Sequence, residues 1–183
     1  MLLSSRTKSL EGGHLEVLGD AAASRRVRRS MAAPSFPANT MFMNTTSDIK
    51  FRVPGDLPQY LQASDSNTIF TGPHNSSDSR GCFNMHFFDV IGVNGNVVVL
   101  ESTNQRYITK DSDNSLKLMT GSGPQQTSQS DDRFFSVHMD EGDNALYLKH
   151  LHSGKFLSAS SSGASLVTSR VDATSFIQFR CNN

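Results

Sequence analysis

The stretch from Ala145 to Phe179 decides the fold of this chain. It reads Ala145-Leu146-Tyr147-Leu148, then Phe156-Leu157, then Ser165-Leu166-Val167, and finally Phe176-Ile177-Gln178-Phe179. Short aliphatic and aromatic runs separated by Gly, Ser and Asn clusters are typical of strands joined by tight turns. The stretch therefore predicts four strands and no helix.

The same plan occurs twice more upstream, in residues 97–137 and, more loosely, in residues 49–90. An aromatic–aliphatic pair opens the second strand of each copy, at Tyr60, Tyr107 and Phe156, which lie 47 and 49 residues apart. An aromatic cluster closes each copy, at Phe87, Phe134 and Phe176, which lie 47 and 42 residues apart. Two independent anchors with one period indicate a threefold internal repeat.

Each copy is too small to bury its own apolar side chains, so the three must share one core. Closing them into a ring also removes exposed strand edges. We therefore expect an all-β domain over residues 48–183, with a six-stranded barrel, a cap of hairpins and almost no helix. Residues 1–47 lack the repeat anchors and are expected to be a disordered leader. The residues Tyr60, Tyr107 and Phe156 are expected to fill the core.

This layout resembles the β-trefoil superfold, in which three hairpins cap a six-stranded barrel. The phrase Gly154-Lys155-Phe156-Leu157-Ser158-Ala159, followed by Gly163 and Phe176, is similar to the repeats of fascin-type and amaranthin-like agglutinin trefoils. Gln105-Arg106-Tyr107-Ile108 resembles the same unit in the middle copy. The resemblance implies a binding module, because proteins of these families bind sugars or actin.

Charge and cysteine content narrow the classes of partner. Residues 48–183 carry 11 basic and 14 acidic side chains, which argues against a general nucleic-acid partner. No apolar run is long enough to cross a membrane, and no apolar segment follows the first methionine, so we expect a cytoplasmic protein without a membrane partner. In that compartment Cys82 and Cys181 are expected to remain free thiols. The basic run at residues 26–29 suits either a solvated charge cluster or a processing site.

Catalytic and metal-binding motifs are missing from the sequence. It contains no nucleophile elbow, no zinc-protease motif, no phosphate-binding loop and no Cys-x-x-Cys pair, so we expect no enzyme activity and no cofactor. His150 and His152 stand two residues apart, with His138 nearby in sequence, but a closed zinc site needs three or four ligands. We therefore expect solvent-exposed histidines and no metal.

The turn after the middle aromatic pair concentrates the groups that hold sugar hydroxyls. Asp111, Asp113 and Asn114 place two carboxylates and an amide within four residues. Carboxylates accept hydrogen bonds from hydroxyls, and amides both donate and accept them. Tyr147 is the tyrosine outside the aromatic-pair position and is the candidate stacking ring. The alternative interpretation is turn chemistry, since tight turns favour the same residue types.

The resemblance and this turn together favour a carbohydrate-binding lectin that catalyses no reaction. The chain has no Trp, whereas the lectin families it resembles rely on Trp, so the expected binding is weak and depends on avidity if the protein forms homo-oligomers. One alternative is an actin-binding, fascin-like interaction domain. Another is a growth-factor or interleukin-type ligand.

Overall fold

The chain forms an all-β domain. The structure, a computed structural model, describes residues 40–74, 79–121, 123, 132–140, 142 and 144–181. These residues hold twelve strands: β1 (Thr40–Val53), β2 (Gln59–Ala63), β3 (Ile69–Pro73), β4 (Phe83–Val90), β5 (Val97–Ser102), β6 (Arg106–Lys110), β7 (Leu116–Thr120), β8 (Phe135–Asp140), β9 (Ala145–His150), β10 (Phe156–Ser160), β11 (Gly163–Val167) and β12 (Ile177–Arg180). The helices among them are three single 3-10 turns: η1 (Ser79–Gly81), η2 (Ser112–Asn114) and η3 (Arg170–Asp172). The predicted all-β class is confirmed.

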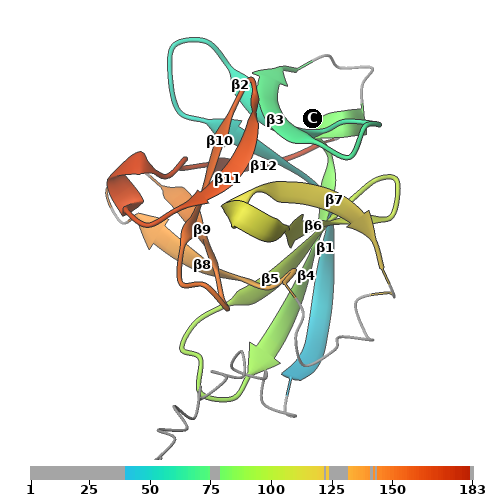
Figure 1. Cartoon of the computed structure of the whole chain (residues 1–183), viewed down its shortest axis with the longest axis vertical. Helices are drawn as coiled ribbons and strands as arrows, with labels where there is room; N and C mark the ends of the chain where they lie inside the picture. Colours follow the sequence, from blue (N-terminus) through green and yellow to red (C-terminus); the bar gives the residue numbers. More distant parts are fainter. Residues whose placement is uncertain are drawn as a thin grey trace, which may run out of the picture. The chain divides into compact units, whose positions relative to one another are not determined.

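The strands form one antiparallel sheet that is nearly closed into a barrel (Figure 1). Strands β1, β4, β5, β8 and β9 pair in that order, and β12 pairs with the other side of β1. The ring closes between β12 and β9, where the backbones of Leu146 and Phe176 exchange two hydrogen bonds of 2.8 Å. The hairpins β2–β3, β6–β7 and β10–β11 stand off this ring.

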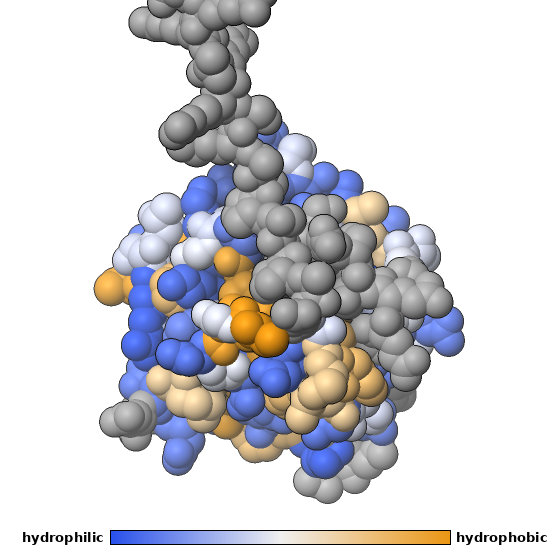
Figure 2. Space-filling model, turned by 90° about the horizontal axis from the view of Figure 1, so that it is seen from below, coloured by the Kyte–Doolittle hydropathy of each residue, from blue (hydrophilic) through white to orange (hydrophobic). Residues whose placement is uncertain are grey.

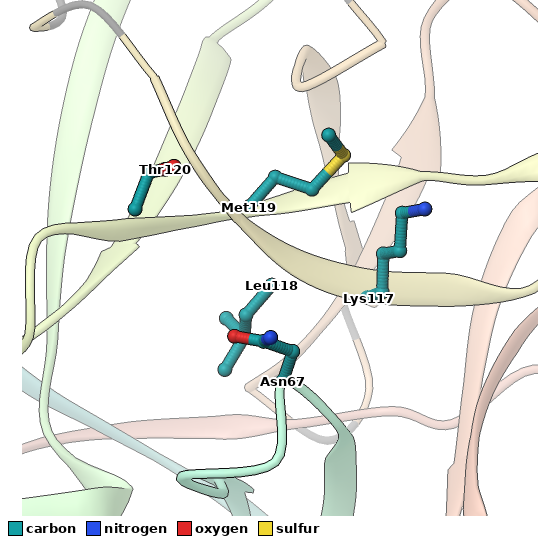
Figure 3. A pocket seen from close by; sticks show the side chains of 5 residues that line it. All are labelled: Asn67, Lys117, Leu118, Met119 and Thr120. Atoms are coloured by element: carbon teal, nitrogen blue, oxygen red, sulfur yellow. The ribbon is translucent and has the colours of Figure 1, made fainter.

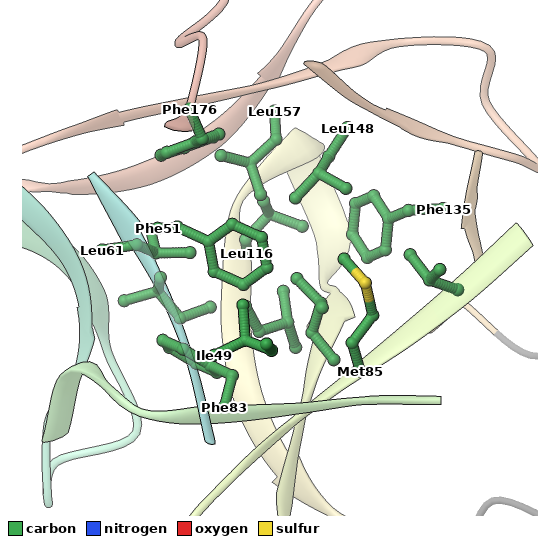
Figure 4. Close-up of a cluster of buried hydrophobic side chains, with 14 of the residues drawn as sticks. Ile49, Phe51, Leu61, Phe83, Met85, Leu116, Phe135, Leu148, Leu157 and Phe176 are labelled. Atoms are coloured by element: carbon green, nitrogen blue, oxygen red, sulfur yellow. The ribbon is translucent and has the colours of Figure 1, made fainter. Parts of the chain in front are cut away.

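Large apolar side chains from the ring and from the hairpins fill the barrel (Figure 4). The centre contains Phe51, Phe83 and Phe176. The ring centroids of Phe83 and Phe176 each lie 6.0 Å from that of Phe51. Alternate residues of each strand point inward, as the period of two requires. Burying each such side chain stabilises the fold by about 2 kcal/mol.

The aromatic pairs occupy this core only in part. The second member of each pair is fully buried, at Leu61, Ile108 and Leu157. The first member points to the opposite face of its strand, so Tyr60 and Phe156 are only half-buried, and the prediction that they fill the core was wrong. Tyr107 is buried, but in a second apolar cluster outside the barrel.

That second cluster extends the domain upstream of Asp48. Strand β1 begins at Thr40, and its first half pairs with β4. Phe42 packs there against Phe88, with ring centroids 5.6 Å apart. The sequence hides this half-strand because Thr40–Ser47 has a short apolar run followed by polar residues, with neither strand alternation nor a repeat anchor. Of the expected leader, residues 1–39 lie outside the described residues.

Among the described residues, no helix is long and apolar enough to cross a membrane.

The expectation of two free thiols was wrong, because Cys82 and Cys181 form a disulfide with their Cα atoms 6.0 Å apart. Strand β4 begins and β12 ends beside the same residue, Ile49 of β1, which pairs with Phe83 on one side and Arg180 on the other. The cysteines flank these two strand ends, so they meet. In the sequence Cys82 lies five residues before Phe87 and Cys181 five residues after Phe176, which suggests opposite ends of repeat-equivalent strands. That comparison overlooks that both strands pair with β1.

Breaking the disulfide is expected to destabilise the domain. The bond closes a loop of 99 residues, and a cross-link of that span stabilises a fold by about 5 kcal/mol, chiefly by restricting the unfolded chain. Urea unfolding of the full chain should show a loss of that size on reduction. The Cys82→Ser/Cys181→Ser double variant should start at the lower stability and not respond to reductant. Two free thiols in the denatured, unreduced protein would contradict the pairing.

Candidate functional site

The predicted sugar-binding turn lies between β6 and β7, and most of its groups build the turn itself. Asp113 and Asn114 adopt positive φ angles of 56° and 65°, where Asn and Asp are the side chains best tolerated after Gly. Lys155 Nζ donates a 2.8 Å hydrogen bond to Asn114 Oδ1, which ties the turn to the start of β10. Asn114 therefore has a partner within the fold.

Asp111 is the member of this turn that pairs with a residue lining a candidate pocket. Its carboxylate pairs with Lys117 Nζ at 2.9 Å, and both side chains are partly exposed. The hydrogen bond from Lys117 lowers the pKa of Asp111 below its ordinary value, with a further contribution from the backbone at Ser112. The carboxylate is therefore ionised at neutral pH and remains available as an acceptor.

Lys117 also lines a pocket of about 300 Å³, which we call the cap pocket. It is lined by Asn67, Lys117, Leu118, Met119 and Thr120 (Figure 3). The pocket forms where the β2–β3 turn meets β7, because Leu118 N–H donates to the carbonyl of Asn67 at 2.9 Å. Figure 3 shows Leu118 beside Asn67, while Lys117 and Met119 project from the other side of β7.

Arg106 fixes the wall of the cap pocket that Asn67 provides. Its guanidinium donates to Asn67 Oδ1 at 2.6 Å and to the Ser64 carbonyl at 3.0 Å. The amide orientation of Asn67 is thereby set, with Nδ2 as the donor left for a ligand. Asn67 also has a positive φ of 66°, which places its side chain at the apex of the turn.

Together the cap pocket offers an amide, an ammonium group, a hydroxyl and the neighbouring Asp111 carboxylate. Met119 is 43% exposed and adds an apolar surface. The sugar-binding residues predicted from the sequence include neither Asn67 nor Lys117 nor Met119. The available signal for Lys117 and Met119 was strand alternation, since both residues flank the buried Leu118 and must face outward.

Tyr147 lies apart from this turn, on β9. Its ring carries the guanidinium of Arg170 at 4.4 Å from the centroid, and the side chain is half-buried. Across the β8–β9 ladder its partner is His138. Among the described residues, no hydrogen bond or ring contact joins Tyr147 to Asp111, so the structure does not bring the predicted stacking ring to the predicted turn.

A larger pocket of about 480 Å³ lies where β1 begins and β4 ends. Its lining includes Asn44, Phe87, Asp89 and Asn96. Next to it, exposed apolar side chains occur at Met41, Met43 and Ile91. Viewed from below, apolar side chains gather among hydrophilic ones on this end of the domain (Figure 2). Nothing in the structure shows what covers this surface.

Among the described residues, no group of three or more His, Cys, Asp or Glu side chains is placed to hold a metal ion. His150 is fully buried, so the expectation of an exposed histidine was wrong there. Its Nδ1 lies 2.9 Å from Ser153 Oγ and its Nε2 lies 3.1 Å from the Asp132 carbonyl. It ties the turn after β9 to the segment before β8.

A second buried histidine belongs to a chain of polar groups that resembles a nucleophilic triad. Thr45 Oγ1 lies 2.8 Å from His86 Nδ1, and Glu101 Oε2 lies 2.7 Å from His86 Nε2. Burial and the neighbouring Glu101 raise the pKa of Tyr107, which completes the cluster. Thr45, His86 and Glu101 do not line either pocket described above. The cluster joins β1, β4 and β5, with His86 and Glu101 buried and Thr45 at its exposed end.

Comparison with known proteins brings no function to this fold. No protein-family model and no curated protein matches the chain. Solved structures that resemble it include that of a Caenorhabditis elegans protein of unknown function, with a TM-score of 0.54 and 11% sequence identity. The match covers 76% of this chain and 97% of that one. At such low identity the likeness concerns the fold alone.

The backbone role of Asn114 predicts a difference between two small replacements. Asn114→Ala and Asn114→Gly both lose the bond to Lys155, but only Ala carries a Cβ into a φ of 65°. Ala should therefore be less stable than Gly by about 1 kcal/mol, the cost of the left-handed conformation. Paired urea unfolding curves measure the difference. Equal stabilities would show that the turn does not impose this φ.

Burial of His150 predicts a loss of stability in acid. Burial is the largest effect and lowers the pKa of His150 below its ordinary value of about 6.5. The unfolded chain then binds the proton more readily than the folded one, so the stability present above pH 6.5 falls as the pH drops through the lowered pKa. An NMR titration of the His150 ring, with a histidine peptide as reference, tests this. A pKa at or above that of the peptide would contradict it.

Proposed function

We propose that the described domain is a β-trefoil that binds carbohydrate and catalyses no reaction. The trefoil assignment is supported by the alternation of strands along the chain. Two ring strands enclose one hairpin in each third: β1 and β4 around β2–β3, β5 and β8 around β6–β7, and β9 and β12 around β10–β11. This grouping follows the three copies expected from the sequence.

The observation that carries the carbohydrate proposal is the cap pocket. A sugar ring presents hydroxyls around its edge and C–H groups on its faces, so its site needs mixed polar groups beside an apolar surface. Asn67 Nδ2 and Lys117 Nζ are donors, the Asp111 carboxylate is an acceptor, and Met119 supplies the apolar surface. These groups come from two neighbouring hairpins whose contact is fixed by backbone hydrogen bonds.

The size and charge of the cap pocket suit one neutral sugar residue. Its volume of about 300 Å³ is at the small end for ligand pockets. Asp111 and Lys117 balance each other's charge, so the pocket does not select a charged ligand. A single contact of this kind binds weakly, and useful affinity requires several sites presented together in an oligomer.

The absence of catalysis is part of the proposal. In the cap pocket the carboxylate of Asp111 is held by Lys117, and its pKa is lowered, so it is a poor general acid at neutral pH. The triad-like residues Thr45, His86 and Glu101 are engaged with one another, and His86 is buried. Their arrangement suits a structural role in the second apolar cluster.

Changing the cap pocket should abolish sugar binding without unfolding the domain. A glycan array probed with the full chain identifies the bound sugar, and calorimetry with that sugar then compares variants. Asn67→Asp keeps the acceptor for Arg106 but removes the Nδ2 donor, and Lys117→Met removes the ammonium group. Each should weaken binding about tenfold or more, since buried contacts to sugar hydroxyls contribute about 1–3 kcal/mol.

Arg180→Gln is the matched control, because it also removes one positive charge but lies on β12 and bonds the Ser47 carbonyl. It should bind like the wild type. Normal sugar binding by the cap-pocket variants would show that the site lies elsewhere. A chain that binds no glycan but sediments with actin filaments would replace this proposal with the interaction-domain alternative.

A further inference from the structure

The outer face of the β8–β9 hairpin carries a second group of polar side chains. In its antiparallel register Ser136 lies opposite Lys149, and His138 lies opposite Tyr147. Cross-strand partners share one face of a sheet, so these four side chains form one strip. We call them the outer strip. None of them lines the cap pocket.

The outer strip borders a pocket of about 280 Å³ that is closed on the other side by the β4–β5 turn. Ser136, His138 and Lys149 line it together with Gly92 and Asn94 of that turn. It is therefore a concave site with two walls from different parts of the chain. Such a site holds a small group better than a flat sheet face does.

Hydrogen bonds fix the tautomer of the His138 imidazole in this pocket. Ser136 Oγ donates to the Lys149 carbonyl at 3.3 Å and lies 3.0 Å from His138 Nε2. A hydroxyl has one proton, so with that proton on the carbonyl, Nε2 is the donor to Ser136. The other ring nitrogen, Nδ1, has no hydrogen bond to a described residue. It becomes a second N–H donor when the ring is protonated.

Positive charge collects at this site although the domain around it is acidic. Lys149 extends over the Phe156 ring, 5.4 Å from its centroid, and Arg170 lies over Tyr147. Asp140 bonds to Arg170 at 3.0 Å, and no carboxylate among the described residues pairs with Lys149. The ammonium group of Lys149 is thus left for a ligand.

We propose that the pocket beside the outer strip binds an oxyanion, such as the sulfate or carboxylate group of an acidic saccharide. Lys149 supplies the charge, and the His138 ring, when protonated, supplies a directed N–H from Nδ1. The half-buried Phe156 ring, 5.9 Å from His138, forms an apolar border that a sugar ring can contact. The site shares no residue with the cap pocket, so it does not depend on the function proposed there.

The setting of His138 gives the site a sensitivity to pH. Burial, followed by the charges of Lys149 and Arg170, lowers the pKa of His138 below its ordinary value. Asp140 lies on the same strand but is engaged with Arg170, and Phe156 is the facing group from β10. A bound anion offsets the two positive charges and raises the pKa of His138. Anion binding must therefore strengthen as the pH falls.

Inorganic sulfate is the probe that tests the site directly. Titrating sulfate into the full chain at constant ionic strength, against chloride, should shift the NMR signals of Gly92, Asn94, His138 and Lys149. It should also raise the pKa of His138, which a structural histidine would not show. Lys149→Met should weaken sulfate binding about fivefold or more, because it removes the single unpaired cation of the pocket. His138→Gln should lose the strengthening in acid.

Arg180→Gln again controls for loss of one charge and should bind sulfate as the wild type does. Dextran sulfate compared with neutral dextran then separates a saccharide ligand from a free anion. Tighter binding of dextran sulfate than of sulfate supports an acidic saccharide. Equal binding of the two, with the site intact, limits the ligand to the small anion. Sulfate shifts spread over the surface, or an unchanged pKa of His138, would overturn the proposal.

Discussion

The rest of the structure depends on how β1 is shared between two neighbours. One side of β1 pairs with β4 and the other pairs with β12, the last strand of the domain. A chain whose first and last strands pair can form a ring, and a ring leaves few exposed strand edges. The disulfide between Cys82 and Cys181 joins the start of β4 to the end of β12 and so holds both strands beside β1.

Both candidate sites follow from this closure. In a nearly closed barrel the hairpins and turns are brought against strands from other parts of the chain. The cap pocket forms where the β2–β3 turn docks on β7, and the pocket at the outer strip forms where the β4–β5 turn faces β8 and β9. Each site combines residues from parts of the chain that are far apart in sequence. The core holds the barrel together, and contacts between distant hairpins and strands form the two pockets.

The sequence predicted the elements of the fold well and its pairings poorly. Alternation and turn residues identified the strands, because both signals are local. The cysteine pairing depends on which strands flank β1, and that is a property of the whole ring. Tyr60 and Phe156 were assigned to the core because the pattern shows an apolar pair but not which member of it points inward. The burial of His150 likewise depends on a contact with Asp132, which is 18 residues away.

The candidate sites show the same limit. The predicted turn at Asp111, Asp113 and Asn114 exists, but tertiary contacts divide its members between turn building and the cap pocket. A turn composition cannot distinguish these roles, since the same side chains serve both. The roles proposed for Lys117 and Lys149 depend on their partners in the folded structure, which the sequence does not reveal. One is paired with Asp111, and the other has no described carboxylate beside it.

The central claim is that the sheet closes into a ring between β9 and β12. Hydrogen exchange of the amides of Leu146 and Phe176 tests it most directly, because these two N–H groups make the closing bonds. The ring predicts that both exchange as slowly as the amides of the β4–β5 ladder, since opening the closure then requires opening the barrel. Rapid exchange of both amides, with the β4–β5 ladder still protected, would show an open sheet and contradict the account.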